Sequence, residues 1–153
     1  MTYTKTVIPE HKQIAIIAHD SKKPELLTWA KAHRSELAKH KLLATGTTGT
    51  LLEDNLELTV EKVQSGPLGG DQQIGAKIVE GKVDCVIFFW DPLEAQPHDP
   101  DVKALLRLAV VWNIPLACNA VSADFMLLSP LMKQAYQRKV PDYANHTNRK
   151  ISA

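Results

Sequence analysis

The residues best suited to chemistry lie in the segment Ser65 to Gln73, which reads Ser-Gly-Pro-Leu-Gly-Gly-Asp-Gln-Gln. It combines a serine hydroxyl, three glycines, one proline and the carboxylate of Asp71. A glycine-rich backbone can approach a ligand closely and turn its amides toward phosphate oxygens. A carboxylate can remove a proton from a bound substrate. The segment therefore predicts a site where a phosphorylated small molecule lies beside one reactive carboxylate, Asp71.

A second reactive side chain, His98, lies further along the chain, between Asp91 and Asp101. Histidine can donate or carry a proton near neutral pH, so His98 is a second candidate for chemistry. Each residue also has a structural explanation when taken alone. The helix dipole favours an acid in a first turn by about 0.3–1 kcal/mol, and a lone histidine is usually structural. Only the surrounding residues can decide between these interpretations.

A third segment, Thr45-Gly46-Thr47-Thr48-Gly49, is called the threonine loop below. Three hydroxyls and two glycines at the expected opening of a helix suit the binding of phosphate oxygens. The sequence lacks the Gly-Lys-Ser/Thr ending of a nucleotide P-loop and the Gly-x-Gly-x-x-Gly pattern of dinucleotide sites. A turn with a helix cap would by itself explain Gly46 and Thr48. The phosphate-binding interpretation of the threonine loop therefore depends on the segment from Ser65 to Gln73.

The first predicted strand is followed by His19 and Asp20 and then by Lys22 and Lys23. Acids and histidines can also bind a metal ion, but no fixed ligand spacing joins the candidates, which are Asp20, Asp91, Asp101, His19 and His98. We therefore expect neither a metal nor another cofactor.

The elements that must position these residues follow from five apolar runs of strand length: 14–18, 42–45, 60–64, 85–89 and 115–118. Segments with helical spacing separate them, which predicts an α/β domain with a doubly wound parallel sheet. The helices are expected over 21–40, around Leu51 and Leu52, from about Asp71 to just before Gly81, from Asp99-Pro100 to about Trp112, and after a cap at Ser122. In the fourth of these, Asp99 is the expected cap and Pro100 fits the first turn. No period is evident after Pro141.

The candidate residues all follow the carboxyl ends of predicted strands. In an open parallel sheet, ligands bind beyond these ends, where helix N-termini point into one crevice. The sequence thus predicts that Asp71, His98, the threonine loop and Lys23 face one another at a single edge of the sheet.

The composition is that of an ordinary globular protein. With 153 residues, 44% of them hydrophobic, the chain fits one domain, residues 1–153, with a core that needs no metal or disulfide. A formal net charge of +1 gives no reason to expect a nucleic-acid partner. Apolar runs are too short for a membrane helix and no signal-peptide pattern begins the chain, so we expect a cytoplasmic protein without a membrane partner.

Several motifs together resemble the methylglyoxal synthase family. They are Ala18-His-Asp with Lys23, the threonine loop, the segment Ser65 to Gln73, Phe88-Phe-Trp-Asp-Pro-Leu, and His98-Asp-Pro-Asp-Val-Lys-Ala-Leu-Leu-Arg. The resemblance is best from Gln13 to Asn119. It implies a single Rossmann-like domain with a five-stranded parallel sheet in the order 3-2-1-4-5, flanked by helices. It also implies a homohexamer, inhibited by inorganic phosphate, that uses no cofactor.

The family's functional residues carry over onto matching positions of this sequence. The resemblance implies that Asp71 is the catalytic base, that His98 is its partner at the substrate oxygens, and that Asp91 and Asp101 are acids of the catalytic group. It implies substrate or phosphate contacts at His19, Lys23, Thr45, Gly46, Thr47, Thr48, Ser65 and Gly66, with Asp20 in support. Either Arg149 or Lys150 matches a C-terminal arginine of the family.

The implied reaction is the conversion of dihydroxyacetone phosphate to methylglyoxal and inorganic phosphate, catalysed by a carbon-oxygen lyase. An alternative is a phosphate-effector-binding module of the same fold, such as the regulatory domain of carbamoyl-phosphate synthetase. Such a module needs the phosphate-binding loops but not the base. The presence of both Asp71 and His98 favours the enzyme.

Overall fold

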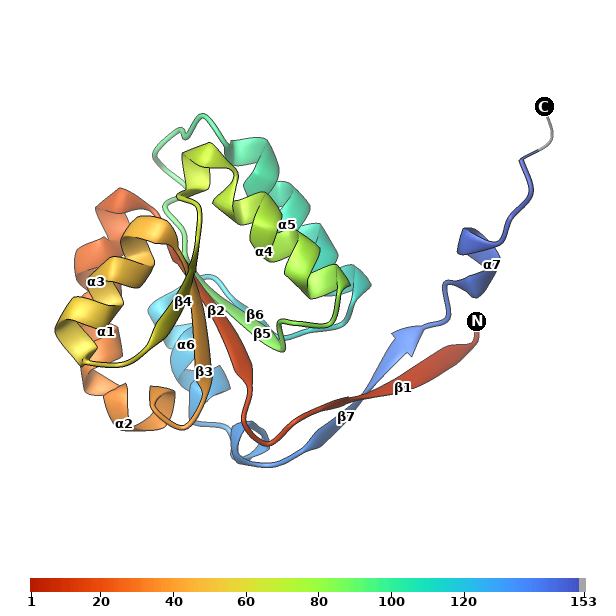
Figure 1. The fold of residues 1–153 in the computed structure, drawn as a ribbon, viewed down its shortest axis with the longest axis horizontal. Helices are drawn as coiled ribbons and strands as arrows, with labels where there is room; N and C mark the ends of the chain where they lie inside the picture. The colour runs from red at the N-terminus through yellow and green to blue at the C-terminus, as the bar shows by residue number, and fades with distance from the viewer. Residues whose placement is uncertain (152–153) are drawn as a thin grey trace.

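A computed structural model describes residues 1–151, and Figure 1 shows the arrangement of their elements. The central sheet is parallel and has the strand order β4-β3-β2-β5-β6. Its strands are β2 (Gln13–Ala18), β3 (Lys41–Thr45), β4 (Val60–Val63), β5 (Cys85–Phe89) and β6 (Leu116–Ala117). The five predicted strands correspond to β2 to β6 in sequence order. The structure therefore confirms the five-stranded sheet and the order 3-2-1-4-5 that the family resemblance implies.

Helices cover both faces of the sheet, which explains why its central strands are continuous apolar runs. One face carries α4 (Gly70–Val79) and α5 (Asp99–Val111), and the other carries α1 (Lys23–Ala32), α3 (Gly46–Leu56) and α6 (Ala120–Leu127) (Figure 1). In β2, Ile14 and Ile16 pack against the α1, α3 and α6 side, whereas Ala15 and Ile17 pack against α4 and α5. Alternate side chains of β2 thus belong to two separate hydrophobic cores, one on each face of the sheet.

A two-stranded antiparallel arm projects from this body. It is formed by β1 (Tyr3–Ile8) and β7 (Tyr136–Pro141), which pair from Tyr3 with Pro141 to Ile8 with Tyr136. The short helix α7 (Ala144–Thr147) lies beyond its tip, as Figure 1 shows. Neither strand was predicted from the sequence.

Three predictions about helices are wrong. The helix expected over 21–40 is instead a 3-10 turn, η1 (Asp20–Lys22), followed by α1 and then α2 (Arg34–Leu37), because the backbone leaves helical geometry at His33. The cap of α6 is Asn119, whose extended backbone lets its side chain accept from the Ser122 N–H at 2.8 Å. Asp99 does not cap α5, because its carboxylate accepts from the Gln96 N–H.

Other helix predictions are confirmed. The helix around Leu51 is α3, α4 ends before Gly81, and that glycine has a left-handed φ of 73°. Two further 3-10 turns, η2 (Gly66–Leu68) and η3 (Pro130–Lys133), complete the connections. Within residues 1–151 the longest apolar helices fall short of what a membrane crossing requires.

Candidate active site

Asp71 is the most unusual residue at the carboxyl edge of the sheet. It lies in the first turn of α4 with 1% of its surface exposed, and neither of its carboxylate oxygens accepts a hydrogen bond within the described structure. Burial raises the pKa of Asp71 above the ordinary value, since removing a carboxylate from water disfavours its charged form. The nearest cationic candidate is His98, whose Nε2 lies 3.4 Å from Asp71 Oδ2. This carboxylate therefore binds a proton more readily than a carboxylate in water, and it has no hydrogen-bond partner within the described residues.

His19 faces the same space with a defined proton position. Its Nδ1 accepts a hydrogen bond from the Asp91 backbone N–H at 3.1 Å, so a neutral ring must carry its proton on Nε2. That Nε2 is buried without a partner, and the His19 and His98 rings lie edge to face with centroids 5.7 Å apart. Burial, together with the nearby His98, lowers the pKa of His19 and keeps it neutral. His19 therefore presents an N–H donor to the space beside Asp71.

The residues predicted above to contact phosphate border these side chains. They are Lys23, the opening of α3, Ser65 and Gly66, and this group is called the phosphate cradle below. Lys23 Nζ donates to Asp20 Oδ1 at 2.5 Å and to Thr47 Oγ1 at 2.7 Å. This pairing holds the pKa of Asp20 below its usual value. The cap residue Thr45 makes no side-chain bond to the first amides of α3. The Gly46 N–H donates to the Gln64 carbonyl at 3.3 Å, so the amides of Thr47 and Thr48, together with the helix dipole, remain available to an anion.

The connection from β4 to α4 is held tightly in place. Gln73 Oε1 accepts from the Gln64 N–H at 2.7 Å, and the Gly70 N–H donates to the Ser65 carbonyl at 3.0 Å. A Cβ at Gly70 would lie 1.9 Å from the Gln64 carbonyl oxygen, and one at Gly66 would lie 2.9 Å from His98 Nε2. These two glycines are therefore required by close approach, and the loop they form sets the position of Asp71.

The residues at this edge enclose a pocket of about 220 Å³. Its predicted members are His19, Asp20, Lys23, Thr45, Thr47, Ser65, Gly66, Asp71 and His98. The remaining candidates support the walls. Thr48 is buried, with its hydroxyl 3.3 Å from that of Thr45, and Gly46 begins α3. Gln96 also lines the pocket, and nothing in its sequence context distinguished it from other loop residues.

The acids Asp91 and Asp101 lie outside the pocket lining. Asp91 accepts from the Ser21 hydroxyl at 2.7 Å, and Asp101 accepts from the Gln72 side-chain amide at 3.1 Å. Arg149 and Lys150 follow α7 beyond the tip of the arm, so they do not reach the pocket of their own chain (Figure 1). Across the described residues, no group of three or more His, Cys, Asp or Glu side chains is placed to hold a metal.

Comparison with known proteins identifies the family. The model of the MGS-like domain matches residues 25–118. The methylglyoxal synthase of Saccharophagus degradans is 64% identical over 136 residues, which cover 89% of this chain and 88% of that protein. The methylglyoxal synthase of Cellvibrio japonicus is 57% identical, with 98% and 97% covered. A crystal structure of the methylglyoxal synthase from Elizabethkingia anophelis NUHP1 superimposes with a TM-score of 0.92 at 54% identity, covering 97% of this chain and 98% of that one. The chain belongs to the methylglyoxal synthase family.

Proposed function

We propose that this protein converts dihydroxyacetone phosphate to methylglyoxal and inorganic phosphate. The observation that carries the proposal is the buried, unpartnered Asp71 carboxylate beside two histidines and a phosphate cradle in one pocket. The names of the relatives support the same reaction. The reaction needs a base, donors for a developing oxyanion and a grip on phosphate, and each has a candidate here.

In the first step, Asp71 removes a proton from the hydroxymethyl carbon of the substrate. The electrons of that C–H bond move toward the carbonyl group and produce an enediolate. The negative charge that develops on oxygen must be stabilised as it forms, and one well-placed donor is typically worth about 3–4 kcal/mol in the transition state. The His19 Nε2–H and the ring of His98, which line the same pocket as Asp71, are the candidate donors.

In the second step, the carbon-oxygen bond to phosphate breaks. The hydroxyl on the former hydroxymethyl carbon loses its proton and becomes the aldehyde, the double bond shifts toward the third carbon, and phosphate leaves with the bonding electrons. The resulting enol takes up a proton on carbon and becomes methylglyoxal. His98 can move protons between these oxygens, while Lys23 and the amides of α3 receive the leaving phosphate.

The proposed reaction is tested by incubating the purified protein with dihydroxyacetone phosphate. Methylglyoxal, trapped as a quinoxaline with o-phenylenediamine, and phosphate, measured with molybdate, are expected in equal amounts. Heat-inactivated protein controls for spontaneous decomposition of the substrate. Phosphate binding without any turnover would support the effector-binding module instead.

Lys23→Met is expected to raise the KM for dihydroxyacetone phosphate by about tenfold or more, because a charge-assisted bond to phosphate is lost. The matched control is Lys22→Met. Lys22 forms a surface ion pair with Glu25 at 3.3 Å and does not line the pocket. Exposed pairs of this kind contribute about 0–1 kcal/mol. The KM values of the two variants are measured by steady-state kinetics. Equal values would show that Lys23 does not bind the phosphate of the substrate.

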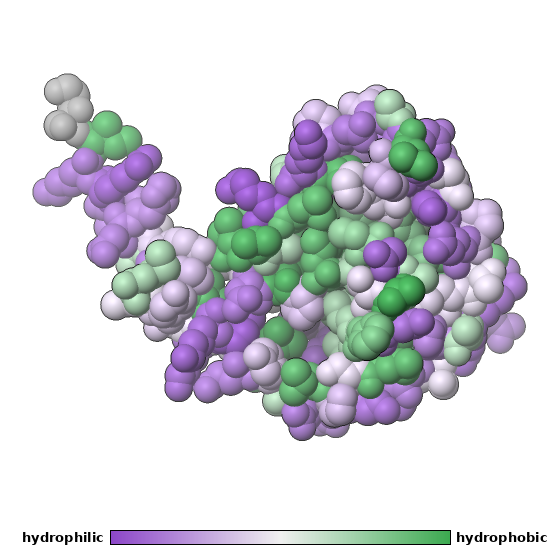
Figure 2. Space-filling model, turned by 180° about the vertical axis from the view of Figure 1, so that it is seen from behind, coloured by the Kyte–Doolittle hydropathy of each residue, from purple (hydrophilic) through white to green (hydrophobic). Residues whose placement is uncertain are grey.

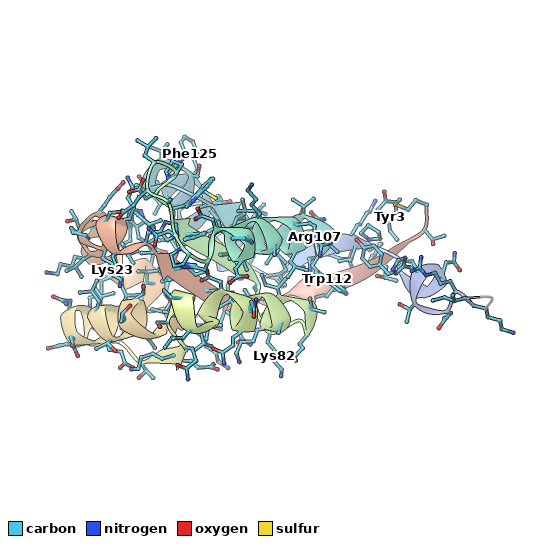
Figure 3. The ribbon with its side chains drawn as sticks, turned by 90° about the horizontal axis from the view of Figure 1, so that it is seen from above. Tyr3, Lys23, Lys82, Arg107, Trp112 and Phe125 are labelled. Atoms are coloured by element: carbon cyan, nitrogen blue, oxygen red, sulfur yellow. The ribbon has the colours of Figure 1, made fainter. Side chains whose placement is uncertain are left out.

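We further propose that inorganic phosphate inhibits the enzyme, since this product fits the same cradle as the phosphoryl group of the substrate. We also propose that the protein is cytoplasmic and assembles as a homohexamer. The projecting arm supports assembly, because isolated two-stranded ribbons are marginally stable in water and Tyr3 and Val7 on this one are more than half exposed. Figure 3 shows Tyr3 on the arm at the opposite end of the molecule from Lys23.

A further inference from the structure

A second cavity, of about 520 Å³, lies at the amino edge of the sheet, opposite the candidate active site. We call it the amino-edge cavity. It is bounded by the residues that precede β2, β5 and β6, by the end of α6 and η3, and by the root of the arm. Figure 2 shows hydrophobic side chains around a hollow where the arm meets the body. Its volume is within the range of about 300–1,000 Å³ that is usual for small-molecule sites.

Three charged side chains in its lining are almost fully buried. Lys12 is 3% exposed, Asp84 is 8% exposed and Arg138 is 6% exposed. Within residues 1–151 no ion pair closer than 4.0 Å joins Asp84 to either cation. Burying charges without direct pairing is costly, and such groups normally have a partner. The three charges line a common space, so a molecule in that space can supply the missing partner.

The hydrogen bonds of these side chains show which capacity remains open. Arg138 Nη1 donates to the Trp112 carbonyl at 2.5 Å, its Nε is buried without a partner, and its Nη2 makes no hydrogen bond within the described residues. Lys12 Nζ donates to the carbonyls of Pro9 and Gln134, which leaves one of its three N–H groups.

Asp84 supplies the complementary group in the same cavity. Its Oδ2 accepts from the Gln13 N–H at 2.7 Å, and its other oxygen makes no hydrogen bond within the described residues. The cavity therefore offers donors from two cations and one acceptor. With two positive charges and one negative charge, the site has a net charge of +1, which a monoanion neutralises.

The remaining lining is largely apolar. Met132 is buried, Met126 is partly buried, and Phe125 is 79% exposed at the mouth. Methionine adapts to irregular ligand shapes, and an exposed aromatic ring beside a cavity can pack on the body of a ligand. Figure 3 places Phe125 on the outer side of α6. This lining matches a ligand with a hydrophobic body.

We propose that the amino-edge cavity binds a small hydroxy acid with an apolar body. Its carboxylate lies between Lys12 and Arg138, its hydroxyl donates to Asp84, and its apolar body packs against Phe125 and Met126. Burial raises the pKa of Asp84 and lowers that of Lys12, because removal from water disfavours the charged form of each group more than the nearby opposite charges favour it. The site does not depend on the reaction at the carboxyl edge.

The test is calorimetric titration of the intact protein with 3-phenyllactate in saturating inorganic phosphate, which occupies the phosphate cradle. We expect one site per chain with a Kd of about 1 mM or tighter. The amide of the same compound, which lacks the charge, is expected to bind about tenfold more weakly. 3-Phenylpropanoate, which lacks the hydroxyl, is expected to bind about threefold more weakly.

Phe125→Ser is the matched variant, because this exposed ring can be removed without disturbing the core. It is expected to weaken 3-phenyllactate binding about fivefold, whereas Val121→Ser, which is 64% exposed on the same helix and outside the cavity lining, leaves binding unchanged. The proposal is overturned by the absence of saturable binding, by equal binding of acid and amide, or by equal binding to the two variants.

Discussion

Asp71→Asn is expected to lower the turnover of dihydroxyacetone phosphate by about 10³-fold or more, because the amide keeps the shape of the carboxylate but cannot accept the substrate proton. Binding of glycerol 3-phosphate, which has the phosphate but no acidic C–H bond, is expected to stay within about threefold. Turnover and calorimetric binding are the two measurements. Asp54→Asn, an exposed acid on α3, is the control. Near-normal turnover by the Asp71 variant would remove this residue from its proposed role.

The same substitution is expected to raise the melting temperature at neutral pH. The folded state raises the pKa of Asp71 above its unfolded value, so the ionised carboxylate destabilises the fold at pH values above both. Below the unfolded pKa, about 4, both states are protonated and the penalty disappears. The difference in melting temperature between variant and wild type should therefore shrink as the pH falls toward 4. A variant that is less stable at pH 7 would contradict this electrostatic account.

Gly70→Ala is expected to abolish most activity and to destabilise the protein. The new Cβ would lie 1.9 Å from the Gln64 carbonyl oxygen and 3.0 Å from the Ser65 carbonyl carbon, and both contacts are with backbone atoms that no rotamer change can move. The loop must open, which displaces Asp71. We expect kcat/KM to fall about 100-fold or more and the free energy of unfolding to fall by about 2–4 kcal/mol.

Gly81→Ala separates this effect from the general cost of replacing a glycine. Gly81 has a φ of 73°, but a Cβ there meets nothing within 4 Å. Backbone strain alone should cost about 1–2 kcal/mol and leave kcat/KM unchanged. Denaturant unfolding and steady-state kinetics on both variants make the comparison. If Gly70→Ala behaves like Gly81→Ala, the close packing of the loop is not what positions Asp71.

Much of the sheet and of its functional edge could be predicted because the signals are local. The runs from Ile14 to Ala18 and from Cys85 to Phe89 are apolar throughout, as strands buried on both faces must be. Polar residues then follow each run, and parallel pairing brings those ends together. The strand order itself came from the family resemblance, because no local pattern specifies which strands are neighbours.

The parts that could not be predicted depend on contacts between distant segments. The break at His33 coincides with a tertiary contact, in which His33 Nε2 and Trp29 Nε1 both lie within 2.8 Å of Asp124 Oδ1 on α6. The proton position of His19 depends on the backbone N–H of Asp91, 72 residues away. The hydrogen bond from the Gln64 N–H to Gln73 Oε1 joins an amide of the loop to a side chain of α4. Residue types alone give no indication of these three features.

The pairing of β1 with β7 has a consequence for how the chain folds during synthesis. The Thr4 hydroxyl donates to the Val140 carbonyl across 136 positions of sequence, so β1 has no partner until the ribosome has released the chain as far as β7. Every strand and helix that carries the candidate active site lies between them. The enclosed sheet can therefore form on a nascent polypeptide, and closing the long loop between the two ends is the last and slowest contact to be made.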